Sequence, residues 1–510
     1  MRICLISREY PPDTGWGGIA TFANHLALGL TALGHEVEVV SLARDGARTV
    51  VQDGIRVHRV EPHQIDGDLG ATALCMPYSR YVIRTCSALW KKFHEIHRAN
   101  PFDVVDSPEL LAEGLIPAVT KAAPLVIRLY TPHSKFIAEQ LHNVTASYDH
   151  QFVAMLERVA MLSADAITSP SDDLADFVSA DLNYPREAIR IVRNPIDPQQ
   201  FSPVGPRAIA SDGRPIVLFV GRLEERKGIG YLVEAIPAVA EIIPEVRFVI
   251  VGDDTNNAAG QRSVLAELKE SIRRRKCERF VEFLPRVPLM ELPNYYRSAD
   301  ICVVPSVYDN SPYTCLEAMS CGKPVIGTSS GGTREYMIHG QSGIIIPPRD
   351  PDSIANALIG LLKSEQERTR LGENARARVL EKFDRKEIAR QMLEIYQDAR
   401  VSYERRKEMS LYRKPPAEAL PDADALLYSH DAMIYNLLYA QSFRFRLKHW
   451  WTLITKRPRL LLAKVFVKAA RSACALSGMR PDQAPTIVRQ MEEEIRIKQK
   501  RAQTEKPALK

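Results

Sequence analysis

The first half of the chain alternates short apolar, β-branched runs with longer segments in which apolar residues recur at helical spacing. Short apolar runs between turn signals are typical of buried strands, and the helical spacing indicates amphipathic crossover helices. The pattern therefore predicts a doubly wound α/β domain with a mostly parallel sheet. We expect helices over 19–33, 78–97 and 146–162, and strands over 3–7, 37–41, 55–60, 104–106, 125–129, 166–168 and 189–192.

The same alternation restarts after residues 196–215, where proline and glycine are concentrated and an interdomain linker is expected. We predict a first Rossmann-like domain over 1–195 and a second over 216–385. A helix over 386–402 could cross back to the first domain, and 403–510 is expected to form a helical, basic extension. In the second domain we expect helices over 229–239, 263–276 and 316–320, and strands over 216–220, 247–251, 281–284, 301–304, 325–327 and 343–346.

Composition excludes several classes of protein. The chain has 510 residues, of which 45% are hydrophobic and 25% charged, as in ordinary globular proteins long enough for two domains. No run reaches the roughly 18 uncharged apolar residues of a membrane-spanning helix. The start of the chain is interpreted as a first strand rather than a targeting segment. Eight scattered cysteines without a C-x-x-C pair indicate reduced core residues of a cytoplasmic protein.

Charge is distributed unevenly along the chain. Residues 401–510 hold 22 Lys and Arg against 11 Asp and Glu, whereas residues 1–400 hold 46 against 51. Within 443–471, aromatic residues including Trp450 and Trp451 are interleaved with cations. A basic amphipathic helix of this kind suits an anionic membrane surface, such as the inner face of a membrane. Packing of the extension on the body or on another subunit is the alternative, and nucleic acid is the least favoured partner.

Two acids stand eight positions apart in the second domain. Asp309 follows the expected strand 301–304, and Glu317 lies two turns into the next helix. At the carboxyl end of a parallel strand, backbone N–H groups and carboxylates can face a ligand crevice. An acid in the loop can bind sugar hydroxyls, and an acid in the helix can bind a second diol such as a ribose. Two acids at this spacing also occur as solvated surface charges.

Two cations mark another turn of the same domain. Gly221 and Arg222 follow the strand 216–220, and Lys227 comes five residues after Arg222, just before a new helix. Cations in such a turn suit a diphosphate, because they neutralise the charge on a leaving group. Exposed surface cations are the alternative interpretation. In the first domain, Gly17 and Gly18 offer free N–H groups at a helix start, although the dinucleotide fingerprint G-x-G-x-x-G is missing.

In combination, these motifs resemble the family 4 glycosyltransferases of the GT-B fold. The resemblance covers about residues 1–400 and includes the run 317–325 that follows the acid pair. It implies a retaining hexosyltransferase that uses a nucleotide diphosphate sugar, binds its donor mainly in the second domain and binds its acceptor beside the first. The site residues it implies are Arg222, Lys227 and Gly221 for the diphosphate, Glu317 for the ribose, Asp309, Ser311, Pro312 and Tyr313 for the donor sugar, Arg286 and Val287 for the base, and Gly17 and Gly18 as further donor-binding residues.

The chain departs from the family pattern at three positions. Asp309 stands where the family usually has Glu, and its shorter carboxylate could alter the preference for the sugar. Pro285 stands where a glycine is often found, next to the expected base contacts. Tyr130 stands where the family commonly has His, and His133 follows three residues later. Tyr130 and His133 are therefore both candidates for contact with the donor sugar, with a structural role as the alternative for each.

The resemblance also implies a mechanism without a metal or cofactor. A phosphate oxygen of the donor would help to deprotonate the acceptor on the face that the leaving group departs from. The sequence shows no Asp-x-Asp suited to a nucleotide-bound Mg²⁺ and no His or Cys ligand cluster. The expected acceptor is a glycan or a lipid-linked molecule. A nucleotide-sugar epimerase on the same fold and a non-catalytic sugar-nucleotide-binding scaffold are the competing hypotheses.

Overall fold

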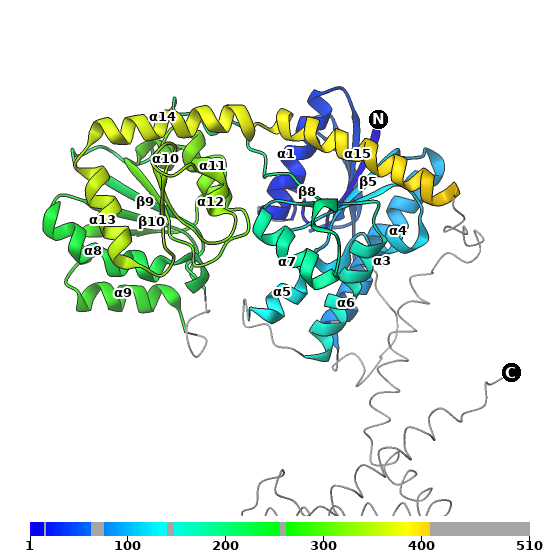
Figure 1. Ribbon diagram of the computed structural model, residues 1–510, viewed down its shortest axis with the longest axis horizontal. Helices are drawn as coiled ribbons and strands as arrows, with labels where there is room; N and C mark the ends of the chain where they lie inside the picture. Colours follow the sequence, from blue (N-terminus) through cyan, green and yellow to red (C-terminus); the bar gives the residue numbers. More distant parts are fainter. Residues whose placement is uncertain (15–16, 63–75, 140–146, 256–261, 409–510) are drawn as a thin grey trace, which may run out of the picture. The chain divides into compact units, whose positions relative to one another are not determined.

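The computed structural model describes residues 1–14, 17–62, 76–139, 147–255 and 262–408, and Figure 1 labels their helices and strands. Residues 409–510, which include the expected membrane-contacting segment 443–471, lie outside the described residues. Two separate sheets are present, each with parallel strands and flanking helices. The predicted fold class, two doubly wound α/β domains, is thereby confirmed.

The first domain is built on an eight-stranded sheet. Its strands are β1 (Arg2–Ile6), β2 (Glu36–Leu42), β3 (Arg48–Gln52), β4 (Ile55–Val60), β5 (Val104–Pro108), β6 (Leu125–Arg128), β7 (Ala166–Ser169) and β8 (Ile189–Ile191). They lie in the order β3-β4-β2-β1-β5-β6-β7-β8, and every neighbouring pair is parallel except β3 and β4. Helices cover both faces of a parallel sheet, so β1 is buried along its whole length.

The strand β3 was not predicted from the sequence. It pairs antiparallel with β4 across a two-residue turn at Asp53 and Gly54, whose φ angles are 51° and 79°. Two-residue hairpin turns favour such positive φ angles, and Asp-Gly is a typical sequence for them. Most of β3 is exposed, so it has no continuous apolar run to mark it as a strand. The Asp-Gly pair was the available signal.

The second domain is built on a six-stranded sheet. Its strands are β9 (Ile216–Val220), β10 (Arg247–Val251), β11 (Val281–Leu284), β12 (Ile301–Val304), β13 (Val325–Thr328) and β14 (Ile344–Ile346). They lie in the order β11-β10-β9-β12-β13-β14, with every neighbouring pair parallel. The chain begins in the middle at β9, runs out to β11 and then crosses to β12. Ligands bind at this change of direction in doubly wound sheets, beyond the carboxyl ends of β9 and β12.

Helices cover the two sheets. In chain order they are α1 (Gly18–Ala32), α3 (Pro77–Ala99), α4 (Leu115–Thr120), α5 (His133–Ala138), α6 (Tyr148–Ser163), α7 (Asp172–Leu182), α8 (Ile229–Ile242), α9 (Val264–Arg274), α10 (Leu292–Ser298), α11 (Tyr313–Ser320), α12 (Thr333–Tyr336), α13 (Pro351–Leu362), α14 (Glu365–Lys382) and α15 (Arg385–Glu408). Single 3-10 turns lie at η1 (Leu110–Ala112), η3 (Arg186–Ala188), η4 (Glu225–Lys227) and η5 (Glu278–Phe280). No helix of these described ranges is both long and apolar enough to cross a membrane.

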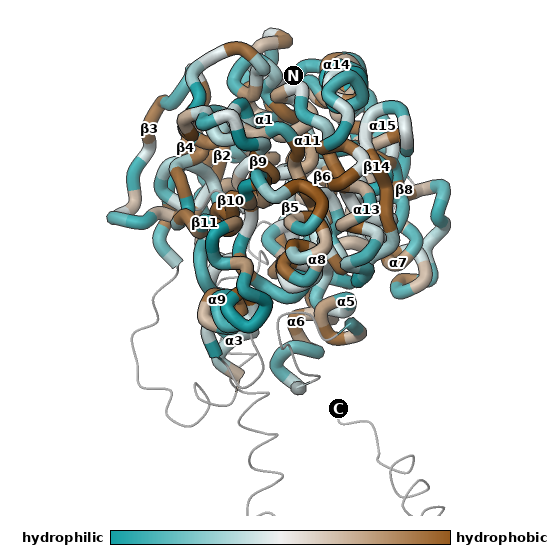
Figure 2. Tube along the Cα trace, turned by 90° about the vertical axis from the view of Figure 1, so that its left-hand side faces the viewer, coloured by the Kyte–Doolittle hydropathy of each residue, from teal (hydrophilic) through white to brown (hydrophobic). Residues whose placement is uncertain are grey.

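Alternate residues of a central strand enter different cores. In β9, Val217 and Phe219 pack with α8, α9 and α13, whereas Ile216 and Leu218 pack with α10, α11 and α14. This division follows from the two-residue period of strand side chains. Figure 2 shows strands such as β6 and β10 as largely hydrophobic segments. The six cysteines within the described residues are buried and unpaired, in line with the expected reduced core cysteines.

The last helix, α15, packs against the first domain. Tyr396 donates a hydrogen bond to Asp106 over 2.9 Å, and Arg190 forms a 2.8 Å ion pair with Asp398. The contact with α1 is close at Gly29, where a Cβ atom would lie 2.5 Å from the carbonyl oxygen of Arg385. The helix expected at 386–402 is therefore part of a longer helix that covers the first sheet.

We predict that Gly29→Ala lowers the free energy of unfolding by about 1–3 kcal/mol, because the added methyl group collides with rigid backbone of α15. Gly360→Ala is the matched control, since no atom lies within 4 Å of its added Cβ. The control should be neutral or up to about 1 kcal/mol more stable, because alanine is the better helix former. Urea unfolding measures both changes. Equal stability of the two variants would contradict the close packing of α1 on α15.

Candidate active site

A cavity of about 600 Å³ opens beyond the carboxyl ends of β9, β10 and β12. Residues from both domains line it. Twelve of the fourteen residues expected at the donor are on its wall, namely Gly17, Gly18, Gly221, Arg222, Lys227, Arg286, Val287, Asp309, Ser311, Pro312, Tyr313 and Glu317. These residues are separated by up to 300 positions in the sequence and meet because parallel strands end at the same edge of a sheet.

Sequence reasoning missed part of the wall. Arg226 lines the cavity directly before Lys227, so the turn after β9 carries three cations rather than two. Asp253 lines it after β10, and Leu289 and Leu292 contribute apolar surface beside Val287. The signal for Arg226 was its position in the same short turn. The other three could be placed only once the loops after β10 and β11 were known.

The turn after β9 is folded tightly against the end of β12. Gly228 has a φ of +70°, and a Cβ there would lie 1.8 Å from the carbonyl oxygen of Pro305. Only glycine fits this approach. Glu224, whose side chain is 2% exposed, lies 2.8 Å from Arg226 and 3.3 Å from Arg222. One buried carboxylate thus orients two of the three cations.

Asp309 lies between two cations. Its carboxylate accepts a hydrogen bond from the Lys227 ammonium and lies 3.7 Å from the Arg226 guanidinium. Burial alone would raise the pKa of Asp309, but Lys227 and Arg226 more than offset it and hold the pKa below its ordinary value. Asp309 is therefore ionised at neutral pH. A diphosphate in this cavity would have to share Lys227 with it.

Glu317, on α11, is more deeply buried than Asp309. Its side chain is buried, and it accepts a 2.7 Å hydrogen bond from the hydroxyl of Tyr296. Burial raises its pKa to about 7, against the opposing effects of Tyr296 and Lys227. The helix α11 begins at Tyr313, directly after Pro312. Its first backbone N–H groups have no partner within the helix and are suited to oxygen atoms of a ligand.

Neither Tyr130 nor His133 is among the residues that line this cavity. The backbone N–H of Tyr130 donates to both oxygens of Glu109, each over 2.8 Å. His133 is 3% exposed, and its ring lies 5.2 Å from the ring of His150 and 5.1 Å from that of Tyr78. Tyr130 is partly exposed, whereas His133 lies in a packed layer of aromatic rings, so this geometry favours the structural alternative for His133.

The loop that carries Asp309 is bonded to the first domain. Asn310 donates to the carbonyl of Tyr130 and to the hydroxyl of Thr131. The Tyr308 hydroxyl donates to Asp173 over 2.9 Å, and Asn194 donates to the carbonyl of Ser311 over 2.9 Å. The position of Asp309 therefore depends on contacts that the acid-pair motif does not contain.

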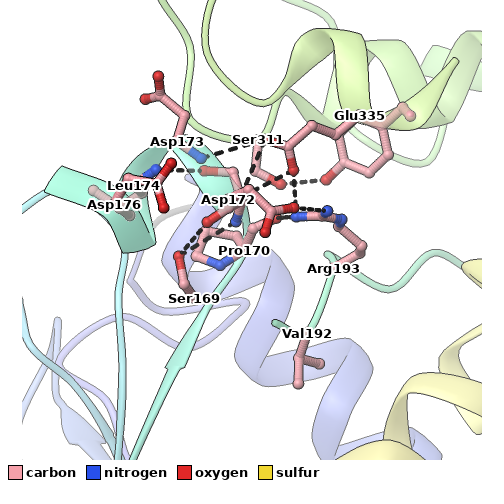
Figure 3. Close-up of polar contacts among 12 residues, drawn as sticks. Ser169, Pro170, Asp172, Asp173, Leu174, Asp176, Val192, Arg193, Ser311 and Glu335 are labelled. Carbon is pink, nitrogen blue, oxygen red and sulfur yellow. Dashed lines mark hydrogen bonds and ion pairs between the residues drawn. The ribbon is translucent and has the colours of Figure 1, made fainter. Parts of the chain in front are cut away.

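A second set of polar contacts lies beside this loop (Figure 3). Glu335 accepts hydrogen bonds from the backbone N–H groups of Asp172 and Asp173 at the start of α7. Arg193 forms ion pairs with both Glu335 and Asp172. A carboxylate at a helix N-terminus satisfies unpaired N–H groups and interacts favourably with the helix dipole. Sequence reasoning missed these contacts, because Glu335 and Asp172 are 163 positions apart.

Family models match both domains. The model for glycosyl transferases group 1 matches residues 206–378, and the glycosyl transferase 4-like domain matches residues 17–195. The chain belongs to the family 4 glycosyltransferases. This is a retaining, nucleotide-sugar-dependent family of the GT-B fold, so the chain is a hexosyltransferase-type enzyme whose donor is a nucleotide sugar. The sequence-based prediction of the family is confirmed.

Named relatives of this family 4 glycosyltransferase act on different acceptors. The glycogen synthase of Mycobacterium tuberculosis is 29% identical over 444 residues, which cover 83% of this chain and 100% of that protein. The D-inositol 3-phosphate glycosyltransferase of Xylanimonas cellulosilytica is 28% identical over 417 residues, covering 76% of this chain and 93% of that protein. The acceptor therefore does not follow from the family.

Solved structures of the same fold also match. The sucrose-phosphate synthase from Thermosynechococcus elongatus has a TM-score of 0.61 at 24% identity, covering 78% of this chain and 98% of that one. HepE of Anabaena in complex with UDP-glucose has a TM-score of 0.56 at 20% identity, covering 78% of this chain and 99% of that one. At these identities the likeness shows the fold alone. Within the described residues, His, Cys, Asp and Glu form no group of three or more that could hold a metal ion.

Two buried acids of the first domain make stability depend on pH. Burial and the neighbouring Glu157 raise the pKa of Glu109 to about 8, and burial raises that of Glu113 to about 8. An acid whose pKa is raised on folding is protonated in the native state while it is ionised in the unfolded chain. Its stabilising contribution is present below the ordinary pKa of 4.5 and is lost as pH rises through the raised value.

We predict that the free energy of unfolding falls as pH rises from about 6.5 to 8, and that Glu109→Gln makes this fall shallower. The amide still accepts from the Tyr130 N–H but does not titrate. Histidines such as His25, whose pKa burial lowers to about 4, act mainly below this window. Urea unfolding at several pH values measures the slope. Glu373→Gln, at an exposed position, should keep the wild-type slope, and an unchanged slope in Glu109→Gln would contradict the prediction.

Proposed function

We propose that the enzyme binds its nucleotide diphosphate sugar in the cavity beyond β9 and β12 and transfers the sugar to a hydroxyl group of a glycan or lipid-linked acceptor, with retention of configuration. The observation that carries this proposal is the convergence of cations and acids on one cavity at the switch point of the second sheet, among them Arg222, Arg226, Lys227, Asp309 and Glu317. Cations suit the diphosphate, and carboxylates suit the hydroxyl groups at its two ends.

Each part of the donor has a matching region of the wall. Arg222, Lys227 and the adjacent Arg226 suit the diphosphate, and Glu317 suits the ribose diol. Arg286 and Val287, together with apolar residues such as Leu289, suit the base. The donor sugar would lie near Asp309, Ser311 and Pro312 and near the first N–H groups of α11, which begin at Tyr313. Gly17 and Gly18 would face it from the start of α1 in the first domain.

The chemistry requires an acceptor O–H on the same face as the leaving group. The acceptor oxygen bonds to the anomeric carbon as the bond from that carbon to the phosphate oxygen breaks. The acceptor proton passes to a phosphate oxygen of the departing nucleoside diphosphate. Arg222, Arg226 and Lys227 stabilise the charge that develops there, which is the role a metal ion has in other transferases. His133 is not required in this scheme.

The observations give the competing hypotheses less support. An epimerase needs acid and base groups on either side of a sugar carbon, and the candidates for that role, Tyr130 and His133, lie off the cavity wall. A scaffold that only binds the sugar nucleotide would use the same cations, but membership of a family whose members include glycogen synthase favours an enzyme. Among the related structures, HepE of Anabaena binds UDP-glucose and starch synthase IV of Arabidopsis thaliana binds ADP, which supports a glucose nucleotide as the first donor to test.

We predict that Arg222→Ala and Lys227→Ala each reduce kcat/KM by about 10²- to 10³-fold, which corresponds to about 2–4 kcal/mol of lost transition-state stabilisation. UDP-, ADP- and GDP-glucose are first screened by thermal shift, since a ligand that binds only the native state raises Tm. Turnover of the selected donor, with an acceptor panel and EDTA present, is then compared among the variants.

Arg274→Ala is the control for this experiment, because Arg274 is an exposed cation of the same domain that lies off the cavity wall. It should keep wild-type turnover. Arg222→Ala and Lys227→Ala variants that also turn over within twofold of wild type would refute the assignment of the diphosphate site. Complete loss of activity in EDTA would refute the proposal that these cations act in place of a metal.

We further propose that the enzyme is cytoplasmic and binds the inner face of a membrane through residues 443–471. The sequence supports this, because these residues interleave aromatic and basic side chains and 432–481 contain no acid. The chain should float with liposomes that contain anionic lipid, and a chain ending at residue 408 should not. Flotation of the truncated chain, or no flotation of the full chain, would refute the membrane contact.

A further inference from the structure

The Glu317 carboxylate is held from behind by a single buried hydroxyl group. Tyr296 belongs to α10, is 1% exposed and donates its hydroxyl hydrogen to Oε2 of Glu317 over 2.7 Å. The ring of Phe201 packs edge-on against the Tyr296 ring, with centroids 6.2 Å apart. Because the phenol ring is fixed by this packing, its hydroxyl group has little freedom to leave the carboxylate.

The two oxygens of Glu317 have different surroundings. Oε2 is bonded to Tyr296 in the core. For Oε1, the described residues provide no hydrogen bond and no ion pair, yet this atom is not among the buried polar atoms without a partner. It is therefore accessible, and Glu317 lines the cavity. The carboxylate thus has one oxygen anchored to the protein and one oxygen available to a ligand.

We propose that Tyr296 is a positioning residue that orients the Glu317 carboxylate toward the ribose hydroxyls of the donor. The inference rests on the proposed function, because it deepens the role assigned to Glu317. Tyr296 itself does not line the cavity. It acts only through the acid, since a hydroxyl that donates to one oxygen leaves the second to accept from a diol.

The ionisation of Glu317 makes this role measurable. Burial raises the pKa of Glu317 to about 7, and the Tyr296 hydroxyl opposes this rise, because it donates to the charged form. Removal of that hydroxyl should raise the pKa further. An ionised carboxylate binds a diol more strongly than a protonated one. The other titratable groups that interact with Glu317 or with the Tyr296 hydroxyl are Lys227, Tyr313, Cys302 and Cys321.

The test uses Tyr296→Phe in the full chain, with Tyr295→Phe as the matched control. Tyr295 is the next residue of α10, and no hydrogen bond is found for its hydroxyl within the described residues. The probes are whichever of UDP, ADP and GDP binds wild type most tightly, and its 2′-deoxy counterpart. Isothermal titration calorimetry between pH 6 and 9 gives Kd for each. Circular dichroism shows whether each variant is folded.

We expect the wild-type Kd to decrease as pH rises through about 7, following ionisation of Glu317. In Tyr296→Phe, Kd at pH 7.5 should increase about tenfold, as expected for a lost hydrogen bond to a charged group. The ratio of the Kd of Tyr296→Phe to the wild-type Kd should fall toward pH 9, and it should be smaller for the 2′-deoxy probe. In a Glu317→Gln background, Tyr296→Phe should change Kd little. Tyr295→Phe should match wild type.

Two results would overturn the inference while leaving the proposed function intact. One is wild-type affinity and pH dependence in a folded Tyr296→Phe variant. The other is a loss of affinity in Tyr296→Phe that is equal for both probes and persists in the Glu317→Gln background. This result would mean that Tyr296 only supports the fold of α10. If none of the three nucleoside diphosphates binds wild type at all, the proposed function is refuted, and this inference is refuted with it.

Discussion

The constraint on which the site depends is the burial of charge at the ends of β9 and β12. Asp309, Lys227 and Arg226 lie together in a partly enclosed position, where an isolated charge would be costly. The carboxylate of Asp309 and the two cations offset the cost of burying one another, and the buried carboxylate of Glu224 forms an ion pair with Arg226. The turn after β9 and the loop after β12 are consequently held together before any donor binds. A diphosphate that enters meets cations whose positions are already set.

The same loop connects this charge cluster to the first domain. Asp309 contacts the cations, whereas its neighbours Tyr308, Asn310 and Ser311 are bonded to residues of the first domain. The contacts of Glu335 with the start of α7 act in the same region. An enzyme that joins two substrates needs the donor residues of one domain in a defined position relative to the other domain, and positioning of this kind can supply a large part of a rate enhancement. The loop therefore has an architectural role as well as a role in donor binding.

The two acids of the motif have different environments and hence different tasks. Neighbouring cations lower the pKa of Asp309 and keep it ionised. Burial raises the pKa of Glu317 to about 7, and this acid interacts with a tyrosine hydroxyl. Family membership establishes the reaction type, and the relatives show that one fold serves several acceptors. The cavity wall supplied by the first domain includes Gly17, Gly18 and Thr21, which add little side-chain chemistry of their own.

The sequence by itself determined the α/β alternation, the family and the residues that gather at the carboxyl ends of the second sheet. It could do so because parallel strands all end at one edge, so residues that follow successive strands must meet there. Only the tertiary structure decided that Lys227 bonds Asp309, that Tyr296 supports Glu317 and that His133 lies in a packed layer. It also revealed the exposed strand β3, which lacks an apolar run. The side-chain contacts among these outcomes join residues that are up to 82 positions apart and depend on how helices and loops pack, which no local pattern encodes.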